Sequence, residues 1–576
     1  MTVNSDSTLR ISSTASRWYS CAVSTGLVGA IFSLIFLVLL VSNFIHSSIV
    51  QARREQELVN QKIEIQKRPD DEQLLTQIRR LDLQYRQNLI RELDFTRKGA
   101  YLLLGSVVIT LIGLKGASVL KKKMPIPRPA ADRLTEQVRQ AKFSRLAVTT
   151  AIVVLGFGAL LLAVRPEIAF FDTTQVDTSI PSPEQISKNW PRFRGPEGLG
   201  ISAYTNVPDH WDGKTGEGIL WKTEVPLAGM NSPVVWEDRV FLSGGDPNSL
   251  EVYCFDASNG RLLWTGNVRQ LSLKEGEEPL DVMEETGYAA PTVATDGRRV
   301  YAIFAPGAVG SFDFDGNKIW EKDLGMPDNM YGYASSLAMF ENLLLVQYDQ
   351  GTVEDGKSVF IALESFSGRK IWEAKRPVGS SWTSPIVTQI DNRYQLVTCS
   401  NPWVIAYNPA DGTELWRADC LGADVAPSPI FASGLIFVIE PNMKTVAIRP
   451  NGHGDVTGTH IAYKIDFAPD ICSPVSNGKM IFLLSSDGLL CCYKTEDGTK
   501  LWEKELREYF QASPSLVGDK LYLLSEEGVM FIVEAGPEYK EAEKCELGEK
   551  SFASPAFVDG RIYIRGQKNL YCIGYQ

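Results

Sequence analysis

Three long apolar runs mark the first third of the chain, at residues 21–47, 99–120 and 146–164. Residues 21–50 contain no Asp, Glu, Lys or Arg, and the second run is interrupted only by Lys115, near its end. A helix of about 20 apolar residues crosses the hydrocarbon core of a bilayer, which is about 30 Å thick. The pattern therefore predicts three transmembrane helices.

Residues 51–98 are densely charged, with an apolar residue at every third or fourth position from Leu74 to Leu93. This spacing predicts an amphipathic helix. Pro69 separates it from a weaker helix, so we expect a helical hairpin. Two interpretations of the hairpin remain open: an exposed coiled-coil-like spacer, and a docking surface for another subunit.

The loop 121–145 holds eight Lys and Arg against two acids. The positive-inside rule places such a loop in the cytoplasm. Residues 1–20 would then be a cytoplasmic tail, and the hairpin and the whole C-terminal part would lie outside. The hairpin opposes this orientation, because it also holds 11 basic residues, balanced by nine acids. Residues 165–188 contain three prolines and predict a linker.

Beyond residue 217 the pattern changes to short strands that recur. Copies of one unit occupy 254–264, 362–372, 406–416 and 492–502, and a shorter copy occupies 311–320. Each copy predicts a strand, a turn closed by Gly and a second strand with a Trp. Gly provides the positive φ that a tight hairpin turn requires.

A second motif, Ser-Pro or a variant of it, precedes a further strand in each repeat. It begins at Asn231, Ala289, Ala334, Thr383, Pro427, Cys472, Ala512 and Ala553. The complete repeats then contain four short strands in roughly 40–50 residues, which is typical of a β-propeller. The sequence therefore predicts an all-β, eight-bladed propeller over residues 189–576.

The two ends of the repeat region complement each other. The last unit stops after three strands, and a spare Trp-bearing strand at 218–225 precedes the first unit. We expect this strand to complete the last blade and leave no open edge. The fifth and seventh units have Tyr463 and Cys545 near the Trp position, and we expect these two blades to pack less tightly.

The charge of the chain is strongly divided. Residues 1–165 hold 23 basic against 12 acidic residues, and the remainder holds 35 against 57. So acidic a body repels phosphate, which excludes nucleic acid as its partner. Nine cysteines are too few for a disulfide scaffold, and four scattered histidines cannot form a zinc site. The residues themselves point to no metal or other cofactor.

Residues 189–576 resemble the pyrroloquinoline-quinone-repeat propellers, a family that includes quinoprotein alcohol dehydrogenases and the assembly scaffold BamB. The repeated Gly-x-x-x-Trp copies carry the resemblance, together with the Trp-Pro-Arg-Phe-Arg-Gly stretch at 190–195. It implies an eight-bladed propeller. For an enzyme of this family it also implies the quinone PQQ with Ca²⁺ over the propeller axis, an Asp base and a vicinal disulfide. The vicinal Cys491 and Cys492 lie on a repeated strand position, which favours core packing instead.

The residues just before the Ser-Pro strands are expected at one mouth of the axial channel. They are Asn231, Tyr288, Tyr333, Trp382, Asp424, Asp470, Gln511 and Phe552. Aromatic rings beside amides and carboxylates suit a flat ligand, but the same residues suit a plug that fills the channel. The repeated tryptophans are expected to join blade to blade: Trp221, Trp264, Trp320, Trp372, Trp416 and Trp502.

These observations favour a non-catalytic binding or assembly scaffold. It would be held by three helices in the inner membrane of a bacterium, with the propeller on the periplasmic side. Its expected partners are the lipid bilayer and a protein that docks on the propeller face or on the hairpin. The alternative is a membrane-bound, PQQ-dependent oxidoreductase.

Overall fold

The computed structural model describes residues 18–19, 21–36, 102–103, 105–119, 180–269, 282–422 and 424–575. The chain forms two compact units, Met1–Val176 and Asp177–Gln576. The hairpin 51–98, the basic loop 121–145 and the apolar run 146–164 lie outside the described residues, as does most of the tail 1–20.

Two helices of the first unit, at 21–36 and 105–119, pack through small residues. A Cβ atom added to Gly113 would lie 2.5 Å from the backbone nitrogen of Gly26, so the two backbones nearly touch. Ser33 Oγ lies 2.9 Å from Ser106 Oγ. Within the described residues, no helix is both long and apolar enough to cross a membrane.

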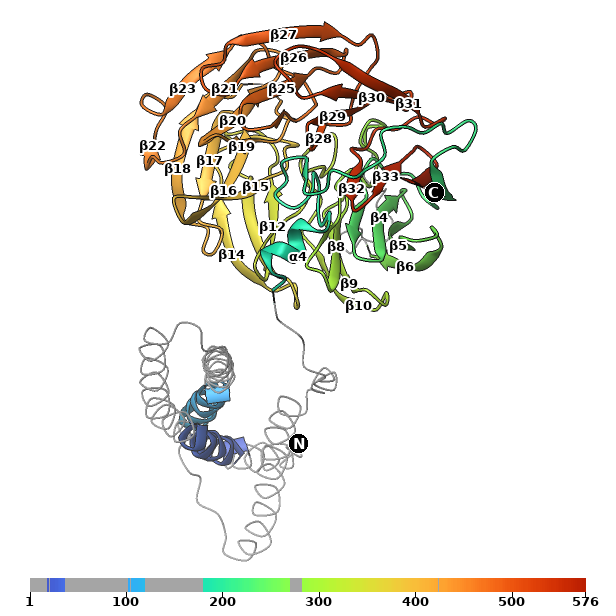
Figure 1. Cartoon of the computed structure of the whole chain (residues 1–576). Coiled ribbons are helices and arrows are strands. Elements are labelled where there is room, and N and C mark those ends of the chain that lie inside the picture. Colours follow the sequence, from blue (N-terminus) through green and yellow to red (C-terminus); the bar gives the residue numbers. More distant parts are fainter. Residues whose placement is uncertain are drawn as a thin grey trace, which may run out of the picture. The chain divides into compact units, whose positions relative to one another are not determined.

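The second unit contains eight sheets that follow one another around a ring (Figure 1). The first four blades are β3 (Val234–Trp236), β4 (Arg239–Gly245), β5 (Leu250–Asp256) and β6 (Leu262–Val268); β7 (Ala294–Thr295), β8 (Arg299–Ile303), β9 (Ala308–Asp313) and β10 (Lys318–Asp323); β11 (Ala338–Phe340), β12 (Leu343–Tyr348), β13 (Val359–Glu364) and β14 (Lys370–Lys375); and β15 (Ile386–Ile390), β16 (Arg393–Ser400), β17 (Trp403–Tyr407) and β18 (Glu414–Asp419). The second and third strands of each blade are almost fully buried, because neighbouring blades cover both of their faces.

The other four blades repeat this order. They are β19 (Ile430–Ala432), β20 (Leu435–Glu440), β21 (Lys444–Ile448) and β23 (Ile461–Ile465); β24 (Val475–Ser476), β25 (Met480–Leu484), β26 (Leu489–Lys494) and β27 (Lys500–Glu505); β28 (Ser515–Val517), β29 (Lys520–Leu524), β30 (Val529–Glu534) and β31 (Glu541–Glu546); and β32 (Ala556–Val558), β33 (Arg561–Arg565) and β34 (Asn569–Gly574) with β2 (Ile219–Glu224). The strand β2 pairs antiparallel with β34 and is the outer strand of the eighth blade. The strand predicted at 218–225 therefore closes the ring, and the expected eight-bladed architecture is confirmed.

The repeated Gly and Trp contact each other across neighbouring blades. The indole Nε1–H of five outer-strand tryptophans donates to a carbonyl oxygen in the turn of the next blade: Trp221 to Ala257 (3.1 Å), Trp264 to Phe314 (2.9 Å), Trp320 to Ser365 (2.8 Å), Trp372 to Pro409 (3.1 Å) and Trp502 to Gly536 (3.0 Å). Gly412 illustrates the second contact, because a Cβ atom there would lie 2.5 Å from the ring of Trp372. Its φ of 75° also suits glycine. One residue thus serves the turn and the blade interface.

Trp416 is the exception among the six predicted tryptophans. It is fully buried, but its Nε1–H donates to Gln395 Oε1 in its own blade, at 2.8 Å. Gln395 Nε2 in turn donates to the carbonyl oxygen of Pro450 in the fifth blade, at 3.1 Å. The glutamine therefore relays the contact between these two blades.

The looser packing expected for the fifth and seventh blades is not observed. In the fifth blade the hydroxyl of Tyr463 donates to the carbonyl oxygen of Thr495, and its ring lies against Gly498, so Tyr463 takes the place of the Trp. Beside the seventh blade, Trp211 from the segment before β2 is 1% exposed and lies against Gly218, which directly precedes β2, the outer strand of the eighth blade. An aromatic ring is thus present in both places, from the Trp position itself for Tyr463 and from outside the repeat for Trp211.

The Ser-Pro motif has a physical role at the inner strands. The hydroxyl at this position accepts the backbone N–H of the equivalent residue in the preceding blade, over distances of 2.9–3.0 Å. The links run in order through Ser232, Thr292, Ser336, Ser384, Ser428, Ser473, Ser513 and Ser554. We call this chain of seven links the hydroxyl belt. Among the described residues, no eighth link joins Ser554 to Ser232.

The segment before the ring joins several inner strands. Within the predicted linker, residues Pro183–Ser187 form the helix α4, capped by Ser182. Trp190 then exchanges two 2.9 Å backbone hydrogen bonds with Val235, and the strand β1 (Ile201–Ser202) pairs parallel with β28. Arg194 donates through Nη2 to Pro474 O at 2.6 Å. Burial lowers the pKa of Arg194 to about 9. Among the described residues, no carboxylate pairs with its guanidinium.

Candidate functional site

One end of the ring gathers most of the irregular loops. Because the four strands of a blade alternate in direction, the loop that enters each inner strand and the turn between its second and third strands emerge at the same end. Backbone hydrogen bonds connect these segments, as from Ser380 N to Gly351 O and from Phe510 N to Ser486 O, both 2.9 Å. We call this end the entry face. The eight residues predicted at the channel mouth all lie in its loops.

Asn231 is held by hydrogen bonds within the protein. It is 1% exposed, and its Nδ2 donates to Ser243 O and Ala289 O at 2.7 Å each. Its Oδ1 accepts from Ser243 N at 3.1 Å and from Arg565 Nη1 at 2.7 Å. Both ends of the amide are therefore occupied, and Asn231 fixes the junction of the eighth and first blades.

The predicted aromatic residues divide into core and surface. Tyr288 and Tyr333 are buried, and the ring of Tyr333 stacks on Tyr348 at 5.3 Å. Burial raises the pKa of Tyr333, so that its hydroxyl stays neutral. Trp382 is only partly buried and packs edge-on against Tyr331, with ring centroids 5.1 Å apart. Phe552 is also partly buried.

The predicted polar residues tie loops together. Asp470 accepts hydrogen bonds from both the backbone nitrogen and the hydroxyl of Ser486. Gln511 Nε2 donates to Glu526 Oε1 at 3.0 Å. Asp424 is exposed. These contacts hold the loops of the entry face in place and leave Asp424 as the predicted carboxylate that faces solvent.

A buried ion pair near the same loops had no signal in the sequence. Arg376 Nε lies 2.6 Å from Asp349 Oδ1, and both side chains are 0% exposed. Gln347 Nε2 and Ser381 Oγ each donate to Asp349 Oδ2 at 2.8 Å. Burial opposes the charge on Arg376, but the Asp349 carboxylate outweighs it and raises the pKa. The pair connects the third and fourth blades and is inaccessible to a ligand.

Large apolar side chains are exposed on the entry face. They are Met283 (39% exposed), Met326 (38%), Met330 (66%), Val353 (39%), Met443 (65%), Ile471 (42%) and Tyr509 (68%). We call this set the apolar rim. It includes four of the ten methionines of the chain. Flexible Met side chains adapt to the shape of a partner and are common at protein-binding surfaces.

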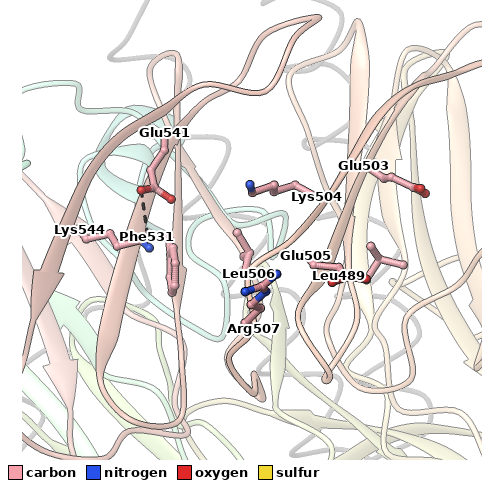
Figure 2. Close-up of a pocket in the computed structure, with 9 residues that line it drawn as sticks. All are labelled: Leu489, Glu503, Lys504, Glu505, Leu506, Arg507, Phe531, Glu541 and Lys544. Carbon is pink, nitrogen blue, oxygen red and sulfur yellow. Dashed lines mark ion pairs between the residues drawn. The ribbon is translucent and has the colours of Figure 1, made fainter.

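A groove of about 670 Å³ opens between the sixth and seventh blades (Figure 2). Its floor is apolar, with Leu489, Leu506 and Phe531. Charged side chains border it: Glu503, Lys504, Glu505, Arg507, Glu541 and Lys544. Lys544 lies over the ring of Phe531, with its nitrogen 4.6 Å from the centroid, and pairs with Glu541 at 3.7 Å. The groove therefore combines a hydrophobic base with charged walls.

A PQQ site with Ca²⁺ needs six to eight oxygen ligands around the ion. Among the described residues, no three His, Cys, Asp or Glu side chains form a group that could hold a metal ion. Cys491 and Cys492 are consecutive residues of β26 whose side chains belong to two different hydrophobic clusters. Their thiols therefore lie on opposite faces of the sheet, which is incompatible with a disulfide between them.

Comparison with known proteins identifies the family. The model of the family described as "Outer membrane protein assembly factor BamB" matches residues 210–353, 355–453 and 457–538, which is more than half of the chain. The chain belongs to the BamB family of PQQ-repeat propellers. No curated protein matches it in sequence.

Solved structures share the fold of this BamB-family chain at low identity. The quinohemoprotein alcohol dehydrogenase of Comamonas testosteroni is 13% identical, with a TM-score of 0.51 over 68% of this chain and 81% of that one. A quinohemoprotein alcohol dehydrogenase of Pseudomonas putida HK5 is 12% identical, with a TM-score of 0.51 over 69% and 82%. BamB of Moraxella catarrhalis is 13% identical, with a TM-score of 0.46 over 62% and 99%.

Proposed function

We propose that this BamB-family chain is a binding scaffold, anchored in the inner membrane of a bacterium, whose propeller presents the entry face to a protein partner. The observation that carries the proposal is the apolar rim. Its seven exposed side chains come from loops of several blades on one face. Exposed apolar groups gathered on one face mark interaction sites on soluble domains. The acidic propeller favours a partner with a basic surface around its apolar contacts.

The first unit supports the membrane anchor. Small residues fill the contact between helices 21–36 and 105–119, while large apolar side chains point away from it. These include Leu27 (64% exposed), Leu34 (62%), Leu111 (60%) and Ile112 (65%). Lipid solvates such side chains well, and small residues at the contact are characteristic of helix pairs in membranes. The basic loop 121–145 supports a cytoplasmic position between the spans.

Site-specific photocross-linking in native membranes tests the scaffold. A photoreactive residue at Met330, on the entry face, should give one discrete protein adduct. The same residue at Tyr394, near the beginning of β16 at the opposite end of the ring and 46% exposed, should give none. The captured protein is then purified, and its affinity for the full-length chain is measured.

The double variant Met330→Ser with Tyr509→Ser should weaken that affinity at least about tenfold, since central apolar contacts dominate protein interfaces. Tyr394→Ser should leave it unchanged. Equal adducts from both ends of the ring, or equal affinities of the two variants, would refute the scaffold. A rise in melting temperature with PQQ and Ca²⁺, together with dye-linked alcohol oxidation, would instead establish the oxidoreductase.

A further inference from the structure

The outer edges of the blades already accept extra strands from this chain. Blade four has a fifth strand, β22 (Gly454–Asp455), which pairs parallel with β18. The residue after it, Val456, is 1% exposed and fills the space between the fourth and fifth blades. An added segment can therefore pair with an outer strand and place an apolar side chain between two blades.

The seventh blade shows the same arrangement. Asp212 forms a parallel bridge with Glu546 at the end of β31, and Gly213 N donates to Glu546 O at 2.8 Å. Trp211, beside this bridge, is buried between the seventh and eighth blades. In both places the chain adds parallel pairing, a two-residue strand at the fourth blade and a single bridge at the seventh, together with a buried apolar side chain.

The edge of β27 in the sixth blade has no such cover among the described residues. Next to it lies the groove of Figure 2, with Leu506 and Phe531 at its base. Trp502 packs against the seventh blade. Every second residue of a strand lies on the same face, so Lys504 and then Leu506 also face this groove. The site thus has the two elements that the covered edges use, a free outer strand and an apolar space beside it.

The charges at this edge indicate which strand would fit. No carboxylate among the described residues pairs with Lys504 or Arg507. The Lys504 ammonium instead lies 5.3 Å from the centre of the Tyr539 ring. Among the described residues, other outer strands carry paired cations, as in the Lys370–Glu373 pair, where the atoms are 2.6 Å apart, as well as exposed cations without a carboxylate partner, such as Lys375 and Lys464. Cross-strand pairs of opposite charge stabilise a sheet, so two free cations favour an added strand with acidic residues.

We propose that β27 binds an extended acidic–apolar segment of another protein as a fifth strand of the sixth blade. On the face of this segment that turns toward the groove, apolar side chains lie over Leu506 and Phe531 and a carboxylate lies beside Lys504. A second carboxylate, beyond the end of β27, meets Arg507. Main-chain hydrogen bonds to a free sheet edge supply affinity, and alternate side chains supply specificity. This site is separate from the apolar rim and does not depend on the partner proposed there.

A defined peptide tests the proposal on the full-length chain in detergent. The probe is a fluorescein-labelled peptide of Val-Ser-Glu-Ser repeats, in which Val and Glu take turns on one face of the strand and Ser occupies the other. Its controls are the Val-Ser-Lys-Ser peptide and a Val-Ser-Glu-Ser peptide N-methylated on alternate residues, which cannot pair along that edge. We expect saturable binding of the first, and affinities at least tenfold lower for both controls.

Substitutions in the protein locate the site. The double variant Lys504→Glu with Arg507→Glu should reverse the preference, so that the Lys peptide binds better than the Glu peptide. Lys370→Glu, on the outer strand of the third blade, should leave both affinities unchanged. Melting curves of the two variants verify that the ring is intact. Absence of binding, equal binding of the N-methylated peptide, or equal effects of the two variants would overturn the proposal.

Discussion

Trp221 holds the one blade junction that the hydroxyl belt leaves open. It lies on β2, is 9% exposed, and donates to Ala257 O in the first blade at 3.1 Å. Its ring covers Gly260, where an added Cβ atom would approach it to 2.5 Å. Because no hydroxyl link joins Ser554 to Ser232, this junction depends on side chains to a greater degree than the other seven.

Trp221→Ala should cost about 3–5 kcal/mol of unfolding free energy, the usual range for a buried Trp reduced to Ala. Trp221→Phe should cost only about 0.5–1.5 kcal/mol, the net worth of one hydrogen bond. The Phe variant keeps the apolar ring, and Ala257 O retains hydrogen bonds from Arg561 Nη1 at 2.9 Å and Tyr563 OH at 3.0 Å.

Trp372→Ala is the matched control. Trp372 makes the same carbonyl contact between the third and fourth blades, but it is more exposed, and the belt link from Ser336 N to Ser384 Oγ remains beside it. We expect a loss of about 2 kcal/mol. Guanidinium unfolding followed by far-UV circular dichroism measures all three variants. Equal midpoints for Trp221→Ala and Trp372→Ala, or for Trp221→Ala and Trp221→Phe, would refute the special role of this junction.

Three further predictions concern single residues. Gly412→Ala should destabilise the ring by more than about 2 kcal/mol, because the added Cβ atom strains the left-handed backbone and meets the ring of Trp372. Gly434→Ala should cost only about 1–2 kcal/mol, because Gly434 has a φ of 76° but no atom lies within 4 Å of the added Cβ. Similar melting temperatures of the two variants would contradict this prediction. Asp349→Asn should cost about 3–5 kcal/mol of unfolding free energy, because it leaves the buried guanidinium of Arg376 without its carboxylate. Glu373→Gln, in the exposed pair with Lys370, should cost at most about 1 kcal/mol. Denaturant titration compares the two variants, and equal losses of unfolding free energy would count against a buried charge at Arg376. Burial raises the pKa of Glu549, but hydrogen bonds from Lys568 N, Tyr571 and Asn569 outweigh it and lower the pKa overall. The Glu549 carboxylate thus stabilises the fold at pH values above the ordinary glutamate pKa, and this stabilisation is lost as the pH falls through the lowered pKa of the folded protein. Glu549→Gln should therefore reduce the fall of the melting temperature over this acid pH range. An unchanged pH profile would show that this carboxylate contributes nothing.

The repeat made most of the architecture predictable from the sequence. Gly and Trp recur at a fixed spacing because each blade must offer a turn that the preceding Trp can cover. The Ser-Pro motif recurs because the hydroxyl satisfies a backbone N–H of the neighbouring blade. In the second unit the motif begins at Ala289, and its belt hydroxyl is that of Thr292, which follows the proline instead of preceding it. The proline thus marks the strand, but it does not by itself identify the hydroxyl.

The site was less predictable than the fold. The residues before the inner strands lie in loops of the entry face, but the sequence could not separate buried Asn231 from exposed Asp424. The exposed rim arises from single loop residues such as Met330 and Tyr509, which have no periodicity. The substitutes Tyr463 and Trp211 were also missed as replacements for the absent tryptophans. Trp211 lies outside the repeat that it completes, so only the folded ring brings it there.

The pairing of β2 with β34 delays closure of the ring until almost the whole chain has been synthesised. Some 345 residues separate the end of the first strand at Glu224 from the beginning of the second at Asn569. A ribosome adds about 5–20 residues per second, so β2 is synthesised roughly 17–70 s before β34. During that interval its hydrogen-bonding groups are available to any other chain nearby. A nascent molecule therefore has to be guarded, by a chaperone or by its own later segments, until translation has almost ended.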